Sequence, residues 1–173
     1  LDEIVEQCRR RGQLVEGPSI PAFEDALGQR LGGGRAVTTS YGRMAFYYIV
    51  KAFRFPAGSE VIFPALTFWA IPELARVAGL KVVFADVDPA TYVMSPAAFE
   101  RALTPRTRAV VPTHLYGLPC NMDAIMSIAA RREIVVIDDC AHAIDATYRG
   151  RTVGTFGDAA FFSLQTLKPL NTY

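Results

Sequence analysis

The polar residues best suited to chemistry follow short apolar runs of the chain. Asp138 and Asp139 come directly after Val135-Val136-Ile137, and His142 follows them closely. A carboxylate at the end of a buried run is costly unless a positive partner lies beside it. A basic side chain, a protonated heterocycle or a metal ion could be that partner. A capped strand end with one solvated aspartate explains the same residues equally well.

Cysteine and histidine commonly bind metal ions, and Cys140 lies between the acidic pair and His142. However, no second group of such residues has a spacing typical of a metal site. The chain has three cysteines, an odd number, and none belongs to a Cys-x-x-Cys pair. The sequence therefore predicts neither a metal site nor a disulfide scaffold, and it fits a reducing cytoplasm.

A second polar segment, Ser40-Tyr41-Gly42-Arg43, runs into an apolar stretch that fits a helix. The backbone N–H groups and the dipole at the start of a helix attract anions, and Gly42 would let a phosphate approach closely. A strand-to-helix turn with a capping serine is the alternative interpretation. The segment alone does not decide between the two.

Three further candidates are ambiguous when each is considered alone. Lys168 stands five residues after Ser163, beyond the last apolar run. An isolated lysine of this kind is more typical of a solvated surface than of a nucleophile. Phe68 is more typical of a core or surface aromatic than of a ring-stacking platform, and His114 fits a satisfied buried side chain as easily as a functional one.

Composition narrows the class of partner. The 173 residues are 51% hydrophobic, and 18 Lys plus Arg balance 17 Asp plus Glu to a net charge of +1. No overall field favours nucleic acid or an anionic membrane. No apolar run reaches the roughly 18 residues of a membrane helix, and the first residues lack a signal-peptide pattern. We therefore expect small-molecule partners, and neither nucleic acid nor membrane.

Short apolar or β-branched runs alternate with segments of helical period, which predicts an α/β fold with a mainly parallel sheet flanked by helices. Six runs are expected to be strands: 35–38, 60–64, 81–86, 108–114, 134–138 and 158–163. Helices are expected over 43–55 and 67–79, after the caps Ser95 and Asn121, and from about Ser19 to the glycines at 32–34. The carboxyl ends of parallel strands meet at one edge of a sheet, so the polar residues above should converge on one pocket.

An ordered series of motifs runs from about Gly17 to the end of the chain. It includes Gly58-Ser59-Glu60-Val61-Ile62, Phe84-Ala85-Asp86-Val87-Asp88, Leu103-Thr104-Pro105-Arg106-Thr107, His114-Leu115-Tyr116-Gly117 and Ile137-Asp138-Asp139-Cys140-Ala141-His142-Ala143. This series resembles the DegT/DnrJ/EryC1/StrS family, a sugar-aminotransferase branch of the fold type I enzymes that depend on pyridoxal 5′-phosphate (PLP).

The resemblance implies a role for each candidate residue. Asp139 would pair with the pyridine nitrogen of PLP and His142 with its phenolic oxygen. Lys168 would form the Schiff base and move protons, and Ser163 would bind the phosphate. The remaining two assignments place Gly42 and Arg43 at the phosphate and Phe68 against the ring.

The same resemblance implies an enzyme of amino-sugar biosynthesis. It would transfer an amino group from an amino acid, usually glutamate, to a nucleotide-linked keto sugar, as a cytoplasmic homodimer. Lys168 favours this activity over the related sugar dehydratases, which have histidine there. We expect an N-terminal arm over 1–18 and an incomplete PLP-binding large domain over 19–173, with a small C-terminal domain absent. The isolated chain should then not turn over substrate.

Three alternatives stay open from the sequence alone. The first is another fold type I PLP reaction. The second is a receiver-like phosphoacceptor domain, which also combines paired acids, a serine and a lysine at strand ends but carries the acids near its start. The third is a non-catalytic fragment or scaffold that pairs with another chain.

Overall fold

The computed structural model describes residues 2–13, 17–168 and 170. It contains two compact units, 1–38 and 39–173. The smaller unit has helices α1 (Asp2–Arg10) and α2 (Ser19–Arg30). The domain boundary predicted between residues 18 and 19 stays a prediction. None of the described helices is long and apolar enough to cross a bilayer.

A five-stranded parallel sheet forms the centre of the larger unit. Its strand order is β2-β1-β3-β4-β7, and every neighbouring pair is parallel. The strands are β1 (Glu60–Pro64), β2 (Lys81–Ala85), β3 (Thr107–Val110), β4 (Val135–Asp139) and β7 (Ala159–Phe161). The predicted fold class and five of the six predicted strands are confirmed.

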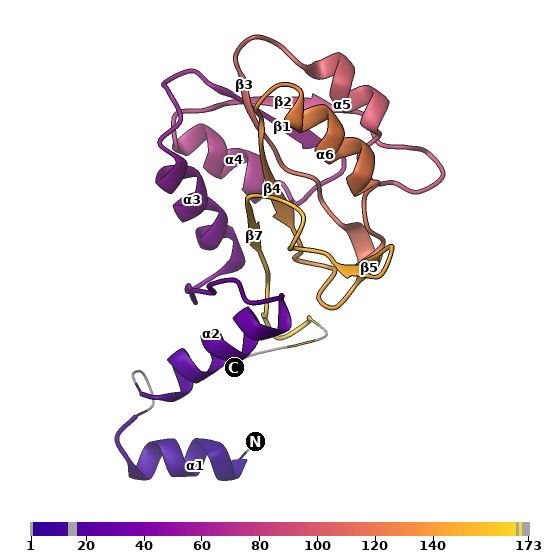
Figure 1. Ribbon diagram of the computed structural model, residues 1–173. Helices are drawn as coiled ribbons and strands as arrows, with labels where there is room; N and C mark the ends of the chain where they lie inside the picture. Colours follow the sequence, from indigo (N-terminus) through magenta and orange to yellow (C-terminus); the bar gives the residue numbers. More distant parts are fainter. Residues whose placement is uncertain (1, 14–16, 169, 171–173) are drawn as a thin grey trace. The chain divides into compact units, whose positions relative to one another are not determined.

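Helices cover both faces of this sheet because its strands are apolar on both sides (Figure 1). Val61 and Phe63 pack in one core with residues of α3 (Gly42–Phe53) and α4 (Ala70–Val77). Ile62, which points the other way, packs with residues of α5 (Pro96–Ala102) and α6 (Met122–Ala130). The strand ends that carry the site therefore belong to a rigid three-layer structure, with the sheet packed between two layers of helices.

Two of the helices begin where the sequence predicts. The Ser95 hydroxyl accepts a hydrogen bond from the Ala98 N–H at 3.3 Å, and Pro96 occupies the first helical position. The Asn121 side chain accepts one from the Ala124 N–H at 3.2 Å. Both caps satisfy a backbone donor that the helix itself leaves without an acceptor.

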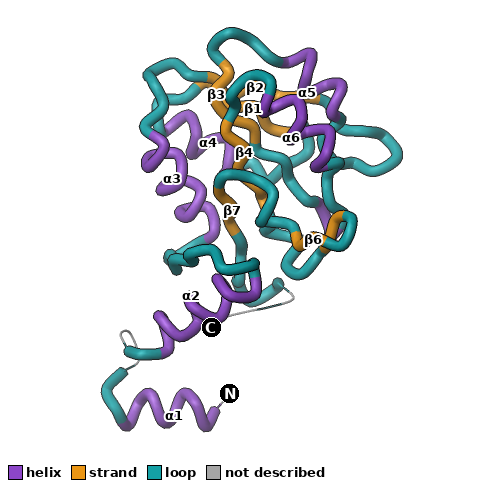
Figure 2. Tube along the Cα trace, in the orientation of Figure 1, coloured by secondary structure: helices purple, strands orange, loops and turns teal. Residues whose placement is uncertain are grey.

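The strand predicted over 35–38 is wrong, because this segment is a loop (Figure 2). The Thr38 N–H donates to the Glu24 carboxylate at 2.6 Å instead of to a neighbouring strand. Val37 is 70% exposed. A small antiparallel pair, β5 (Thr147–Tyr148) with β6 (Arg151–Thr152), was not predicted. In its turn Arg149 has φ 50°, a left-handed conformation that is usually predicted from glycine or asparagine and not from arginine.

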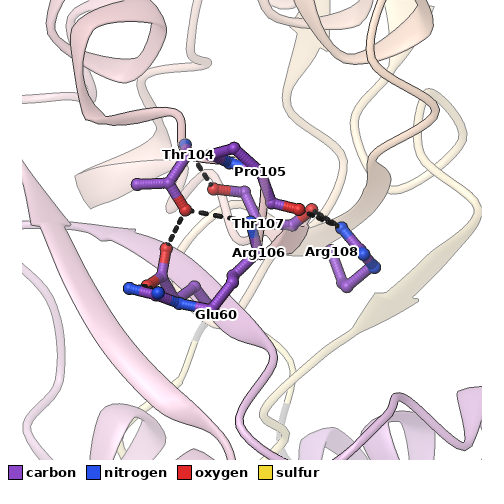
Figure 3. Close-up of polar contacts among 6 residues, drawn as sticks. All are labelled: Glu60, Thr104, Pro105, Arg106, Thr107 and Arg108. Carbon is purple, nitrogen blue, oxygen red and sulfur yellow. Dashed lines mark hydrogen bonds and ion pairs between the residues drawn. The ribbon is translucent and has the colours of Figure 1, made fainter.

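At the amino edge of the sheet, the buried Glu60 carboxylate is held by two side chains of the loop before β3 (Figure 3). The Thr104 hydroxyl donates to one oxygen, and Arg106 Nε donates to the other at 2.9 Å. These hydrogen bonds, the one from Thr104 first, hold the pKa of Glu60 below its usual value. We call Glu60, Thr104 and Arg106 the amino-edge clamp.

Candidate active site

The carboxyl ends of β1, β3, β4 and β7 lie at one edge of the sheet because all four strands are parallel. The polar loops after these strands therefore meet, as the sequence predicts. The segment Ser40–Arg43 follows no strand, but Gly42 begins α3, whose residues pack on β7.

Asp139 is the last residue of β4 and is 2% exposed. One carboxylate oxygen accepts the Ala141 N–H at 3.0 Å, and the other accepts the Thr113 hydroxyl at 3.3 Å. Burial raises the pKa of Asp139 to about 6, although both hydrogen bonds and the charge of Lys168 act in the opposite direction. No described basic side chain forms an ion pair with this carboxylate, so it is well placed to receive a cationic ligand group.

Asp138 has a different environment although it is the adjacent residue. Its neighbour Val136 packs toward α5 and α6, whereas Ile137 packs toward α3 and α4, so strand alternation turns the two aspartates to opposite faces. One Asp138 oxygen accepts the N–H groups of Gly154 at 3.1 Å and Gly157 at 3.3 Å. Burial raises the pKa of Asp138 to about 6 against these bonds. Asp138 thus fastens the loop that leads into β7.

Gly157 shows how closely that loop approaches β4. A Cβ atom on Gly157 would lie 2.5 Å from the Val136 carbonyl oxygen, so no other residue type fits without moving backbone. The Asp158 carboxylate accepts the Val136 N–H at 2.8 Å. Together these contacts set the position of β7, and Ser163 and Lys168 follow that strand.

Lys168 lies in a turn, partly buried, with its backbone N–H donating to the Gln165 carbonyl at 2.8 Å. Burial lowers the pKa of its amine, while Asp139 acts to raise it. A lower pKa increases the fraction of neutral amine, which is the nucleophilic form. Lys168 and Asp139 therefore each influence the pKa of the other, which agrees with the sequence hypothesis that they serve one site.

His142 follows Asp139 in the loop after β4. Its ring stacks on the ring of Tyr116, with centroids 5.3 Å apart and planes 15° apart. Its Nδ1 atom is buried and has no hydrogen-bond partner among the described residues. Burial first, and the charge of Lys168 second, lower the pKa of His142. A neutral imidazole with an unused nitrogen can bind a ligand oxygen.

Gly42 and Ser163 are two of the three predicted phosphate-binding residues, and they are neighbours although they come from distant parts of the chain. A Cβ atom on Gly42 would lie 2.5 Å from the Phe162 carbonyl oxygen and 3.3 Å from the Ser163 Cα. Glycine is therefore needed for the start of α3 to lie against Ser163. The first N–H groups of a helix have no acceptor within it, so they and the Ser163 hydroxyl suit a shared anion.

The other two predicted cofactor residues have local contacts only. The Arg43 guanidinium lies over the Tyr41 ring, 4.2 Å from its centroid. Phe68 is 51% exposed, and its ring is 5.8 Å from that of Trp69. Their roles at the phosphate and the ring stay predictions.

The sequence interpretation missed Thr113 and Tyr116. Thr113 is buried and its hydroxyl donates to Asp139. The sequence pattern that could have identified it is a hydroxyl residue directly after the strand-end segment Val110-Val111-Pro112. Tyr116 is 85% exposed and has φ 51°. His114 is buried, its Nδ1 accepts the Cys120 N–H at 3.1 Å, and burial lowers its pKa to about 4.

These features fit one class of cofactor. An amine of lowered pKa suits an aldehyde, a buried carboxylate without a cation suits a protonated ring nitrogen, and the start of α3 beside Ser163 suits a phosphate. With a parallel sheet beneath them, they fit the PLP-binding domain of fold type I.

The particular family follows from comparison with known proteins. The profile of the DegT/DnrJ/EryC1/StrS aminotransferase family matches residues 1–173, and the chain belongs to this family. The family is PLP-dependent, so the receiver-like alternative is wrong.

The chain is similar to UDP-2-acetamido-2-deoxy-3-oxo-D-glucuronate aminotransferase of Pseudomonas aeruginosa, with 35% identity over all of this chain and 48% of that protein. Its structure is similar to an aminotransferase from Psychrobacter cryohalolentis (TM-score 0.94, 32% identity, 98% of this chain and 44% of that one). It is also similar to the PLP form of Spr1654 from Streptococcus pneumoniae (TM-score 0.91, 26% identity, 96% and 46%). The chain thus spans about half the length of these relatives.

Proposed function

We propose that the protein containing this chain is a PLP-dependent aminotransferase that transfers an amino group from an amino acid, such as glutamate, to a nucleotide-linked keto sugar. The observation that carries the proposal is the combination of Lys168 with Asp139, which is buried at the carboxyl edge of the sheet and forms no ion pair with any described residue. Family membership and the similarity to a UDP-sugar aminotransferase support the substrate class. We further propose that the enzyme is a cytoplasmic homodimer.

When bound, PLP supplies a ring that accepts electron density as the substrate carbon loses its proton. The Nζ atom of Lys168 would hold the cofactor covalently and would move the proton at the substrate carbon. The Asp139 carboxylate holds the proton on the ring nitrogen. The buried nitrogen of His142 binds the phenolic oxygen.

Four residues orient the cofactor in this proposal. The Ser163 hydroxyl and the N–H groups at Gly42 and Arg43 bind the phosphate, and the exposed face of Phe68 stacks on the ring. Asp138 and Gly157 hold the loop before β7, the strand that leads to Ser163 and Lys168. Precise placement of this kind is a large part of enzymatic rate enhancement.

Covalent trapping tests the proposal. Borohydride treatment of the full-length protein with PLP should leave a phosphopyridoxyl group on Lys168, identified by peptide mapping. Lys168→Ala should abolish both this adduct and the glutamate-dependent change in the absorbance of the bound cofactor. Lys51→Ala, which removes an exposed lysine of α3, is the matched control and should change neither. An adduct on another lysine would show that Lys168 is the wrong residue.

Transfer to the sugar is tested separately. With glutamate as donor, the full-length protein should aminate UDP-linked 3-keto sugars, detected as a new primary amine by mass spectrometry. Trapping on Lys168 without any amination of nucleotide sugars would support the alternative of another fold type I PLP reaction.

A further inference from the structure

Two threonines from different strand ends form a chain of hydroxyl groups that ends on Asp139. The Thr113 hydroxyl lies 3.3 Å from one Asp139 oxygen, and the Thr67 hydroxyl lies 3.2 Å from that of Thr113. Thr113 is 5% exposed and Thr67 is partly buried. This chain of hydroxyl groups therefore links the loops after β1 and β3 to the end of β4 through side chains alone.

Backbone hydrogen bonds fix Thr113 beside Asp139. The Asp139 N–H donates to the Pro112 carbonyl at 3.0 Å, and the His114 N–H donates to the Asp139 carbonyl at 3.0 Å. Thr113 and Asp139 are thus partners in a parallel bridge that extends the β3–β4 pairing. Their side chains meet because of this register and not through a flexible loop.

The direction of the hydrogen bonds follows from chemistry. An ionised carboxylate only accepts hydrogen bonds, so Thr113 must donate its single hydroxyl proton to Asp139. The Thr113 oxygen can then only accept from Thr67, which becomes the first donor of the chain. Two aligned hydroxyl dipoles therefore point toward the charge on Asp139, and hydrogen bonds in such a chain strengthen one another.

From this geometry we propose that Thr113 and Thr67 are positioning residues that keep Asp139 ionised and correctly oriented for a protonated ring nitrogen. The proposal rests on the proposed function for the identity of that ligand group. The expected effect of the two threonines on the pKa of Asp139 is independent of the proposed function, because it exists in the cofactor-free protein.

Other groups around Asp139 do not replace this chain. Burial raises the pKa of Asp139, and the hydrogen bond from Thr113 is the only side-chain hydrogen bond that lowers it among the described residues. The charge of Lys168 also lowers the pKa of Asp139. The thiols of Cys120 and Cys140 are influenced by Asp139, but burial raises their pKa values and keeps them neutral. Loss of the Thr113 hydroxyl should therefore raise the pKa of Asp139 further.

The experiment measures the pKa of Asp139 directly in the full-length, cofactor-free protein. Carboxyl carbons of aspartate are labelled with ¹³C, and the Asp139 signal is assigned by its loss in Asp139→Asn. Thr113→Val keeps the shape of the side chain but removes the hydroxyl, and it should raise the pKa by roughly one unit, the value of a hydrogen bond to a charged group. Thr113→Ser restores a hydroxyl and should return the pKa close to the wild-type value.

Thr67→Val should raise the pKa in the same direction by a smaller amount, and it carries the test if Thr113→Val does not fold. Thr104→Val at the amino-edge clamp is the matched control and should leave Asp139 unchanged. An unchanged pKa in both valine variants, or no recovery in Thr113→Ser, would overturn the proposal. Because no cofactor is present, failure of the aminotransferase hypothesis would appear in the trapping experiment and not in this titration.

Discussion

Glu60 and Asp139 are buried acids at opposite edges of one sheet, and their surroundings differ in a way that separates structure from function. Glu60, the first residue of β1, forms an ion pair with Arg106 at 2.7 Å and binds the Thr104 hydroxyl. Among the described residues, Asp139, the last residue of β4, accepts hydrogen bonds from uncharged donors only. The pKa of Glu60 is lowered, whereas that of Asp139 is raised to about 6.

The difference shows what a buried charge reports about its site. A carboxylate with a basic partner and a full set of hydrogen bonds is already neutralised, so it stabilises the fold and offers little to a ligand. A buried carboxylate that is held by neutral donors alone still carries an unpaired charge, so a cationic ligand group beside it would be stabilising. The amino-edge clamp is therefore structural. Asp138 is also held by neutral donors, so the influence of Lys168 is what distinguishes Asp139 as the acid of the candidate site.

The largest effect on activity should come from removing the charge of Asp139, compared with removing the charge of the neighbouring Asp138. Asp139→Asn should lower kcat/KM for the half-reaction with the amino donor roughly 10²–10³-fold, because it removes the charge that holds a proton on the cofactor ring. Asp138→Asn keeps an oxygen for the Gly154 and Gly157 N–H groups and should cost far less. Stopped-flow absorbance with glutamate measures both, and equal losses would contradict the division of roles.

The second effect is a pair of opposite pH dependences of stability in the cofactor-free protein. The folded pKa of Asp139, about 6, lies above its usual 3.8, so the folded state binds more protons and stability falls as pH rises through this window. Asp139→Asn should remove this cost, gaining up to about 3 kcal/mol relative to wild type above pH 6, since one pKa unit is about 1.4 kcal/mol. Urea unfolding between pH 4 and pH 8 measures it.

Glu60→Gln should show the opposite dependence in the same titration. The folded pKa of Glu60 lies below its usual 4.5, so its stabilisation is present above that pH and is lost as pH falls through the folded value. The variant should be less stable than wild type at pH 7 and should approach it in acid. Parallel pH profiles for the two variants would contradict the contrast between the two edges.

The third effect is the loss of stability when the amino-edge clamp is removed. Glu60→Ala deletes the acceptor of Thr104 and Arg106 and should destabilise the full-length protein by about 2 kcal/mol, which is modest because Arg106 is exposed and can return to water. Glu73→Ala is the matched control, since it removes an exposed ion pair with Arg76 and should cost under about 1 kcal/mol. Equal losses would show that the clamp is no stronger than a surface pair.

The sequence predicted the elements better than the partners of individual side chains. The apolar runs of β1 and β4 and the caps at Ser95 and Asn121 are local signals, and the structure confirms them. The residues 35–38 carry the same local signal but lie in a loop, because a strand also needs a neighbour to pair with.

The candidate site shows the same limit. Alternation along β4 predicts that Asp138 and Asp139 face opposite sides, which the structure confirms. Their partners come from distant positions: Thr113 lies 26 residues before Asp139, and Gly157 lies 19 residues after Asp138. Only the β3–β4 and β4–β7 registers bring these groups together, and a single sequence does not specify those registers.

The smallest effect compares the two threonines that donate to buried acids at opposite edges. Thr104→Val removes the hydroxyl that binds Glu60 and also accepts the Arg106 N–H at 3.0 Å, so it should destabilise the fold by about 1 kcal/mol at pH 7. Because Arg106 still neutralises Glu60, cofactor binding should be unchanged. Thr113→Val should show the reverse pattern, with weaker PLP binding by fluorescence titration and a smaller change in urea stability, since protonation of Asp139 relieves the cost of its burial. If both variants lost stability and cofactor affinity to the same extent, the two edges would not differ in role as their hydrogen bonds indicate.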